Sequence, residues 1–203
     1  MQTLKKSVRH SIEKTALKLF AASGYENTTM AEVAAAAGIS TGNIYRYHAN
    51  KEELLYAIIP ESFVEICLQT IRSKVALIEG MSSRQVAGSK ELRLGNERLL
   101  KFLFAHRSKI LVLMRGCAGT RLTDFRNVVR QTVIDSVFEH FASLAKSSLS
   151  RKKLPDRILL AVIYDNLICA ATSILGADAT EKCLREAFKG LLAYHLNGMA
   201  ALC

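Results

Sequence analysis

The chain has no tryptophan and only two prolines among its 203 residues, and aromatic residues make up 7% of it. Few prolines leave long stretches free to form uninterrupted helices, because proline breaks the interior of a helix. Apolar residues recur at helical spacing, and they never form an unbroken run of about 18, the length that crosses a bilayer. We therefore expect an all-α protein that does not enter a membrane.

Closely spaced cysteine pairs are absent as well. The five cysteines, Cys67, Cys117, Cys169, Cys183 and Cys203, show no CxxC spacing, which argues against a zinc site and a disulfide framework. Reduced thiols fit a cytoplasmic protein. The sequence also lacks HExxH, GxSxG and P-loop patterns, so it predicts neither an enzyme nor a bound cofactor or metal.

Acidic residues are scarce: 18 stand against 28 basic ones, which gives a formal net charge of +10. Most of this excess falls in residues 84–130, where eleven Lys or Arg face three acids. Two interpretations remain open. The side chains are solvated helix faces, or an inward arginine such as Arg115 or Arg121 holds an anionic small molecule.

The segment from Thr28 to Leu55, TTMAEVAAAAGISTGNIYRYHANKEELL, is the most informative. Thr29 and Glu32 have the spacing of a capping box at a helix start. The helix that follows carries one apolar face, and Gly38 can adopt the positive φ that ends a helix and turns the chain. The residues of this face are Met30, Val33, Ala34 and Ala37.

A second helix is predicted over residues 41–48, capped by Ser40, with Ile44 and His48 on its inner side. Its outward residues suit contacts with phosphates and base edges: Thr41, Asn43, Tyr45, Arg46 and Tyr47. Asn50 and Glu53 form a second predicted capping box, and Lys51 sits in the first turn behind it. A helix N-terminus with a lysine predicts a phosphate anchor. Helix, glycine turn and helix together predict a helix-turn-helix that reads the DNA major groove.

At these residues the chain resembles the TetR family of bacterial transcriptional regulators, from LKLFAASGY (Leu17 to Tyr25) through KEELL. The resemblance places Thr41, Gly42, Asn43, Tyr45 and Tyr47 at DNA, with Tyr45 and Lys51 on phosphates. His48 stands where the family usually has an aromatic residue, and we expect it to be half-buried and hydrogen-bonded; a pH-sensitive docking of the helix is a further hypothesis. The full set of candidate DNA-binding residues is Thr29, Ser40, Thr41, Gly42, Asn43, Tyr45, Arg46, Tyr47 and Lys51.

Two domains are expected: residues 1–50 as the helix-turn-helix domain and residues 51–203 as a helical effector-binding and dimerisation domain. In the second, Pro60 predicts a kink or a break with a new helix starting there, Gly80–Ser83 and Arg151–Pro155 predict loops, and Thr120 predicts the cap of a helix reaching about Ser147. The last two helices are expected over about 156–175 and 180–196.

The resemblance implies that these last two helices form a four-helix interface in a homodimer, although their pattern alone also fits packing within one chain. The candidate interface residues are Ile158, Ala161, Val162, Leu184, Phe188, Leu191 and Leu192. It also implies a pocket for an unidentified small-molecule effector. The candidate lining residues are Phe63, Cys67, Phe102, His106, Met114, Arg115, Arg121, Phe125 and Tyr164.

The predicted function is that of a TetR-like regulator, a repressor that binds a palindromic operator in double-stranded DNA as a dimer. The effector would release it by favouring a conformation with mismatched spacing of the DNA-reading heads. The alternative is a helix-turn-helix adaptor that acts through protein–protein contacts without specific DNA binding.

Overall fold

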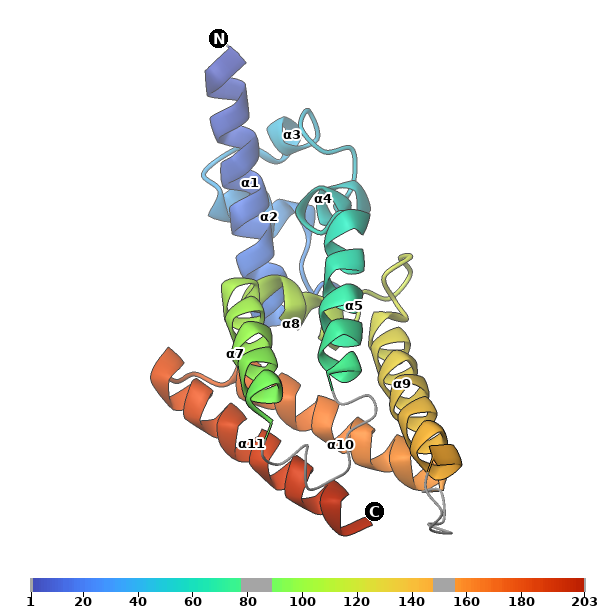
Figure 1. The fold of residues 1–203 in the computed structure, drawn as a ribbon. Helices are drawn as coiled ribbons and strands as arrows, with labels where there is room; N and C mark the ends of the chain where they lie inside the picture. The colour runs from blue at the N-terminus through green and yellow to red at the C-terminus, as the bar shows by residue number, and fades with distance from the viewer. Residues whose placement is uncertain (1, 78–88, 148–155, 203) are drawn as a thin grey trace. The chain divides into compact units, whose positions relative to one another are not determined.

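The computed structural model describes residues 2–77, 89–147 and 156–202. Within these ranges the chain forms ten helices and no strand, which confirms the all-α prediction (Figure 1). The helices are α1 (Gln2–Ser23), α2 (Met30–Ala36), α3 (Thr41–Ile44), α4 (Lys51–Ile58), α5 (Glu61–Ala76), α7 (Lys90–Ala105), α8 (Arg107–Arg115), α9 (Phe125–Ser147), α10 (Arg157–Gly176) and α11 (Glu181–Leu202).

The chain divides into two compact units. Unit 1 comprises Met1–Ile66 and His106–Arg126, and unit 2 comprises Cys67–Ala105 and Asn127–Cys203. Unit 1 thus holds the whole predicted helix-turn-helix segment together with α4, α8 and the start of α5. The expected division at residue 50 stays a prediction about the domains as functional parts.

Helix α1 anchors the core of unit 1. Ile12, Ala16 and Phe20 lie on one face of it at helical spacing and are all fully buried. The Phe20 ring meets that of Tyr25 edge to face at 5.3 Å between centroids. The helix ends at Gly24, which has a φ of +89° and lets the chain turn toward α2.

Pro60 separates α4 from α5, as the sequence predicted. The two helices are bent by 48° at this break. Proline cannot donate a backbone hydrogen bond, but it fits just before a helix, where the first amide groups have no intrahelical acceptor. The amides of Phe63 and Val64 then donate to the Pro60 carbonyl at 2.9 and 3.3 Å.

The prediction that a helix begins at Thr120 is wrong, because α9 begins at Phe125. The Thr120 hydroxyl donates to the Cys117 carbonyl at 2.7 Å and accepts from the Leu122 amide at 3.1 Å. These bonds hold residues 117–123 in a compact turn, which also contains Gly119 at a φ of +77°. A threonine can satisfy the backbone of a turn in the same way that it caps a helix, so its type alone does not separate the two.

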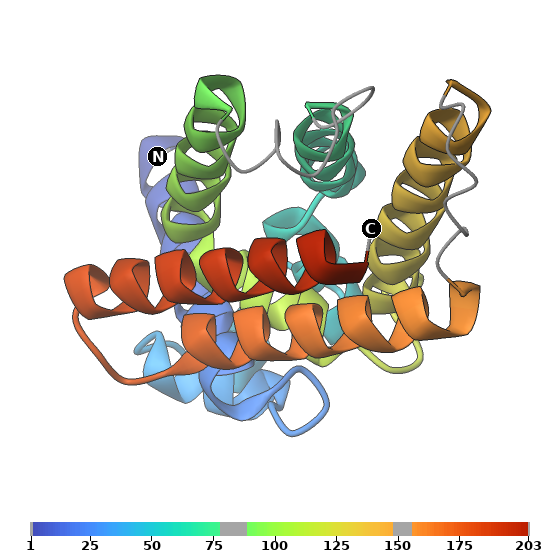
Figure 2. The ribbon, with the colours of Figure 1, turned by 60° about the horizontal axis from the view of Figure 1, so that its bottom comes forward.

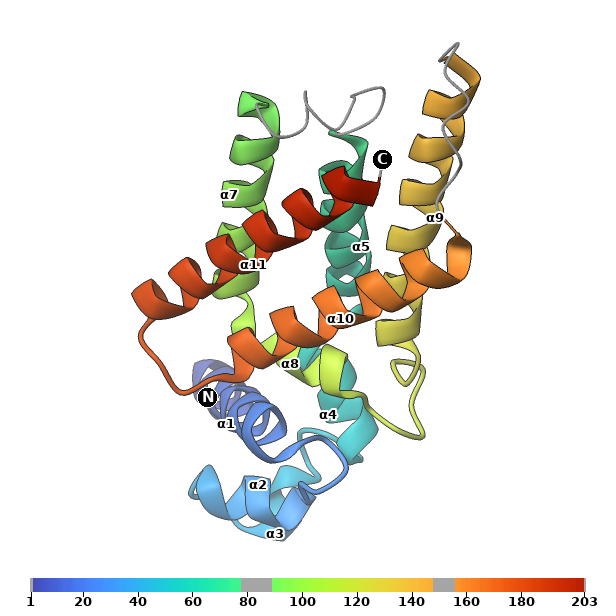
Figure 3. The same cartoon turned by 90° about the horizontal axis from the view of Figure 1, so that it is seen from below.

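In unit 2, α10 and α11 run antiparallel and side by side (Figures 2 and 3). The carboxylate of Asp156 caps α10 by accepting from the Ile158 amide at 2.7 Å. Both helices begin within a residue of the predicted position, and α11 continues to Leu202. The predicted loops at Gly80–Ser83 and Arg151–Pro155 lie outside the described residues.

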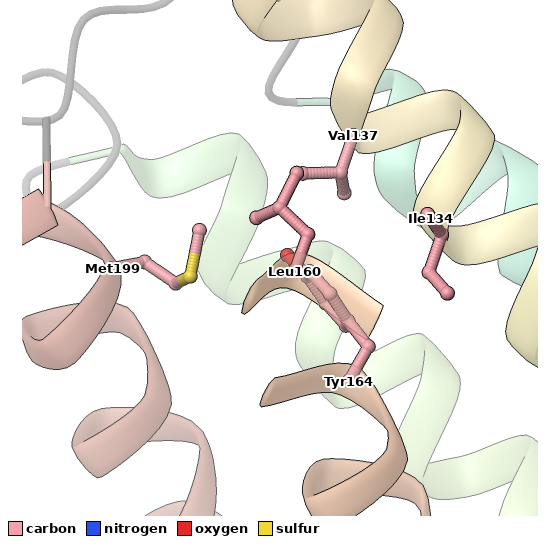
Figure 4. Packing of buried hydrophobic residues seen from close by; sticks show 5 residues of the cluster. All are labelled: Ile134, Val137, Leu160, Tyr164 and Met199. Carbon is pink, nitrogen blue, oxygen red and sulfur yellow. The ribbon is translucent and has the colours of Figure 1, made fainter. Parts of the chain in front are cut away.

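An apolar cluster of unit 2 brings together α9, α10 and α11. Its buried members are Ile134, Val137, Leu160, Tyr164 and Met199 (Figure 4). Partly buried apolar residues pack against this cluster, among them Val75 of α5 and Phe138 of α9.

Helix α10 is unusually apolar, with a mean hydropathy of 2.0 over its most apolar stretch. By length and composition α10 could cross a membrane, contrary to the expectation from the sequence, and so could α4 and α5 if they formed one bent segment. One such helix is weak evidence, since a core helix of a soluble protein meets the same criteria. Part of its apolar surface is solvent-exposed in the single chain, including Ile158 and Val162.

Candidate nucleic-acid interface

Helix α2 is fixed at both ends by the bonds that its sequence predicted. The Glu32 carboxylate accepts from the Thr29 amide at 2.7 Å, and the Thr29 hydroxyl accepts from the Glu32 amide at 3.2 Å. This capping box holds the pKa of Glu32 below its usual value, because both Thr29 donors bond to the charged carboxylate. Of the predicted apolar face, Met30, Val33 and Ala34 are buried and Ala37 is half-buried.

Gly38 ends α2 with the pair of hydrogen bonds that makes a Schellman motif. Its φ is +72°; its amide donates to the Ala35 carbonyl at 3.1 Å, and the Ile39 amide donates to the Ala34 carbonyl at 3.0 Å. This left-handed glycine redirects the chain by the sharp angle that brings α3 against α2 (Figure 3).

Helix α3 is shorter than predicted. Ser40 caps it by accepting from the Asn43 amide at 3.3 Å, but regular α-helix ends at Ile44 and residues 45–47 form turns. The Arg46 and Tyr47 amides donate to carbonyls three residues back, at 3.1 and 3.0 Å. The backbone thus continues as a tighter coil, which keeps the side chains at the predicted surface.

The candidate DNA-binding side chains on this segment are accessible. Tyr45 is 50% exposed, an unusual fraction for a large aromatic ring, and Ile44 beside it is fully buried. Gly42 has open space around it, so the backbone there can approach another molecule closely. The exposed candidates are Thr29, Ser40, Thr41, Gly42, Tyr45 and Arg46, and the half-buried ones are Asn43, Tyr47 and Lys51.

His48 differs from its expected state. It is 1% exposed rather than half-buried, and neither ring nitrogen has a hydrogen-bond partner among the residues that the structure describes. Oε1 of Glu13 lies 3.7 Å from Nε2. Burial lowers the pKa of His48, and Arg9 adds to the effect, while Glu13 and Glu53 act in the opposite direction. His48 therefore fills the aromatic position as a neutral ring, and the expected hydrogen bond is wrong.

Lys51 lies at the head of α4 as predicted, and its ammonium group is bonded within the protein. Its Nζ donates to the carbonyls of Tyr25, Glu26 and Thr28 at 2.9, 3.3 and 2.9 Å. It also lies 4.4 Å from the centre of the Tyr25 ring. Lys51 thus ties the loop between α1 and α2 to α4, a role different from the predicted phosphate anchor.

The second predicted capping box forms only in part. The Asn50 side chain caps α4 by accepting from the Glu53 amide at 2.7 Å, whereas the Glu53 carboxylate accepts from the Ala49 amide rather than from Asn50. The bond from the Glu53 amide to Asn50 still satisfies a free amide at the helix start.

A further bond joins α1 to the turns that follow α3. The Arg9 guanidinium donates to the Tyr47 carbonyl at 3.2 Å.

The last residue of α8 and the turn that follows it are bonded to other parts of unit 1 by contacts that sequence periodicity could not reveal. The Ala118 amide donates to the Glu26 carboxylate at 2.7 Å, and the Arg115 guanidinium donates to the Ala21 carbonyl. The Arg121 guanidinium lies 4.0 Å from the centre of the Tyr56 ring. Arg115 and Arg121 are both exposed, so the expectation that either points inward is wrong.

The other candidate ligand residues are divided between the units. Phe63, His106, Met114 and Phe125 belong to unit 1, where the Phe63 and His106 rings meet edge to face at 5.1 Å. Cys67, Phe102 and Tyr164 belong to unit 2. Their predicted role in ligand binding stays a prediction.

The candidate interface residues of unit 2 differ in exposure. Ile158 and Val162 are 76% and 53% exposed, whereas Leu184 and Phe188 are each 3% exposed within the single chain. Ala161, Leu191 and Leu192 are half-buried. Tyr194, which was not among the candidates, is 79% exposed on α11 and is a further apolar side chain available to a partner.

Taken together, the fold and this surface define an all-α protein with an N-terminal helix-turn-helix. Residues 12–58 match the family described as bacterial regulatory proteins, tetR family. This match is confined to the N-terminal segment, so the similarity to the family concerns that segment.

A curated relative, the HTH-type transcriptional regulator HbdR of Aromatoleum sp. (strain CIB), is 44% identical over 48 residues. That match covers 24% of this chain and 21% of the relative's length, so it concerns the N-terminal segment alone.

Two solved structures share the fold over most of the chain. The fatty acid degradation regulator FadR from Bacillus halodurans is 22% identical, with a TM-score of 0.52, over 93% of this chain and 98% of its own. The transcriptional regulatory protein RHA5900 is 21% identical, with a TM-score of 0.57, over 90% of this chain and 94% of its own. At these identities the similarity establishes the fold.

Proposed function

We propose that the chain is a DNA-binding transcriptional regulator that reads a palindromic operator as a homodimer. The observation that carries this proposal is the accessible surface of residues 40–47. There a polar, basic and aromatic set of side chains projects from a short capped helix behind the Gly38 turn. A surface of this composition suits the phosphates and base edges of the major groove.

Dimerisation follows from the small size of this surface, since one recognition helix contacts too few base pairs to specify a site. Two copies related by a two-fold axis would read two half-sites. The exposed apolar side chains of α10 and α11, including Ile158, Val162 and Tyr194, supply a surface for the second copy. Covering them would remove from water the apolar area that the single chain leaves exposed.

The regulator is proposed to act as a repressor that a small molecule releases. A ligand can change DNA affinity only if it binds one conformation of the protein more tightly than the other. In this proposal the ligand favours the conformation whose two recognition helices no longer match the spacing of the half-sites. Addition of the ligand would then weaken operator binding without any change in the DNA-contacting residues.

The test is selection of sequences from a randomised double-stranded DNA library by the purified full-length protein, followed by binding measurements at two salt concentrations. Enrichment of one palindrome supports a dimeric, sequence-specific regulator. Salt-sensitive binding without enrichment would indicate a nonspecific DNA binder, because phosphate contacts alone give salt-dependent affinity. Absence of binding under both conditions would favour the protein–protein adaptor.

Variants separate the residues that read from those that position. Asn43→Ala and Tyr47→Ala are expected to change the preferred sequence, because base-edge contacts carry specificity. Arg46→Ala is a matched comparison for an exposed cation on the same turn, and it should lower affinity for all sequences alike. Equal effects of all three variants on every sequence would contradict this assignment.

A further inference from the structure

Lys74 is the one lysine of the described part of unit 2 whose pKa is strongly lowered by burial. It lies in the last turn of α5, and burial reduces its pKa to about 8. No carboxylate contributes to this shift, and Lys74 takes part in none of the ion pairs found among the described residues. A partly buried ammonium group without a counter-ion is costly, so its surroundings favour the arrival of an anion.

The packing of α5 against α7 explains how this ammonium group is held. At Gly95 of α7 an added Cβ would lie 2.2 Å from Leu77 Cδ1 and 3.7 Å from Lys74 Cδ. The aliphatic part of the Lys74 side chain therefore passes close to the α7 backbone. A larger residue at position 95 would push this side chain away from α7. Lys74 still keeps part of its surface exposed, so a solute can reach it without unfolding the unit.

His195 of α11 is the second basic group at this place. Its pKa is lowered to about 4, first by burial and then by the positive charge of Lys74. The ring is therefore neutral near pH 7 and can donate one N–H group. It meets the Tyr164 ring edge to face, with 4.9 Å between the centroids.

The same residues border the apolar cluster of unit 2. Tyr164 belongs to that cluster, and so does Met199, which lies one helical turn after His195 on α11 (Figure 4). Val75, the residue after Lys74, packs against the cluster as well. The N–H donor His195 thus contacts a member of the apolar cluster, and the cation Lys74 precedes a residue that packs against it.

From this juxtaposition we propose that unit 2 binds an organic anion with an apolar chain, whose carboxylate or phosphate head pairs with Lys74 and accepts a hydrogen bond from His195. The inference rests on the ligand response of the proposed regulator and gives that ligand a chemical class. It also moves the expected anion site from Arg115 and Arg121, which are exposed in unit 1, to Lys74.

The experiment is isothermal titration calorimetry of the full-length protein at pH 7 without DNA. The three probes are octanoate, octyl phosphate and the uncharged octanol, each below its aggregation concentration. At least one of the two anions is expected to bind about tenfold or more tightly than octanol, since a partly desolvated ion pair contributes on the order of 1.4 kcal/mol or more. Comparison of the two anions tells which head group the site prefers.

Lys74→Met should abolish this preference and bring the anion and octanol within about twofold of each other. This variant is expected to fold, because methionine fills a similar volume and removes a desolvated charge. Lys101→Met, which removes an exposed lysine of α7 in the same unit, is the matched control and should leave the preference intact.

Three results would overturn the inference: octanol binding as tightly as the anions, binding of neither anion by the wild-type protein, or an unchanged preference in Lys74→Met. A loss of thermal stability in Lys74→Met together with no anion binding would instead assign Lys74 to the C-terminus of α5, where a cation offsets the helix dipole. These outcomes are independent of the DNA selection, which is performed without any of the probes.

Discussion

Replacement of His48 by phenylalanine tests whether a buried neutral histidine destabilises unit 1. His48 is 1% exposed, and both ring nitrogens lack hydrogen-bond partners within the described ranges of the chain. A buried polar group without a hydrogen bond costs about 1–3 kcal/mol, and the phenylalanine ring removes that cost while it keeps an aromatic ring in place. The larger ring adds some crowding, so a net stabilisation of about 1–2 kcal/mol is expected at pH 7.

The pH dependence of this gain follows from the lowered pKa of His48. Between that pKa and the ordinary value of about 6.5 the unfolded chain binds a proton that the folded protein excludes. The contribution of neutral His48 is therefore fully present above pH 6.5, and it is lost as the pH falls from 6.5 toward the folded pKa. The stability difference between His48→Phe and wild type should accordingly grow with acidification.

Urea denaturation monitored by circular dichroism at pH 8, 7, 6 and 5.5 measures this difference. His195, whose pKa is also lowered, titrates in both proteins, so its effect cancels when the variant is compared with wild type. DNA binding of both proteins over pH 6–8 tests whether the histidine also governs docking of the recognition segment. A variant less stable than wild type at every pH, by about 1 kcal/mol or more, would refute the reasoning and indicate that a solvent molecule satisfies the ring.

Three further results are expected. Lys51→Ala removes three charge-assisted hydrogen bonds to carbonyls and should cost about 1–2 kcal/mol of stability. It should also weaken binding to all DNA sequences and make the affinity less dependent on salt. Unchanged thermal stability would contradict the structural role of Lys51. Gly38→Ala places a side chain at a φ of +72° and should destabilise by about 1–2 kcal/mol, whereas Gly42→Ala, at ordinary φ with open space around it, should leave stability nearly unchanged in thermal melts. Ile158→Lys combined with Val162→Glu should shift the protein from dimer to monomer in analytical ultracentrifugation. Lys182→Glu, on the exposed start of α11, is the control for a changed charge. A persistent dimer of the double variant would exclude this face as the interface.

The sequence predicted local structure well wherever one residue type determines the backbone. Positive φ at Gly38, the cap at Thr29 and the break at Pro60 each depend on a property of a single side chain, and each was found where it was predicted. The predicted start of α9 was wrong because the Thr120 hydroxyl can bond to backbone groups of a turn as readily as to those of a helix. In that case two local structures compete for one hydroxyl, and packing decides between them.

The partners of charged and polar side chains were less predictable, because they depend on residues far away in sequence. The carbonyls that receive Lys51 lie 23 to 26 positions earlier, and the acceptor of Arg115 lies 94 positions earlier. Helical periodicity carries no information at such separations. The capping pattern identified Lys51 as a cation at a helix start. The three carbonyl groups around Lys51 come together only when unit 1 folds.

The last two helices show the same limit for apolar residues. Ile158 and Leu184 have the same character and lie on similar stripes, yet one is 76% exposed and the other 3% exposed. An apolar stripe predicts that a helix face is buried, but it does not show whether the same chain or a second copy buries it. Since Leu184 and Phe188 are already covered in one chain, the surface left to a partner is that of Ile158, Val162 and Tyr194. The stability of a homodimer built on α10 and α11 should therefore depend on these three side chains far more than on Leu184 and Phe188, which share their helical pattern.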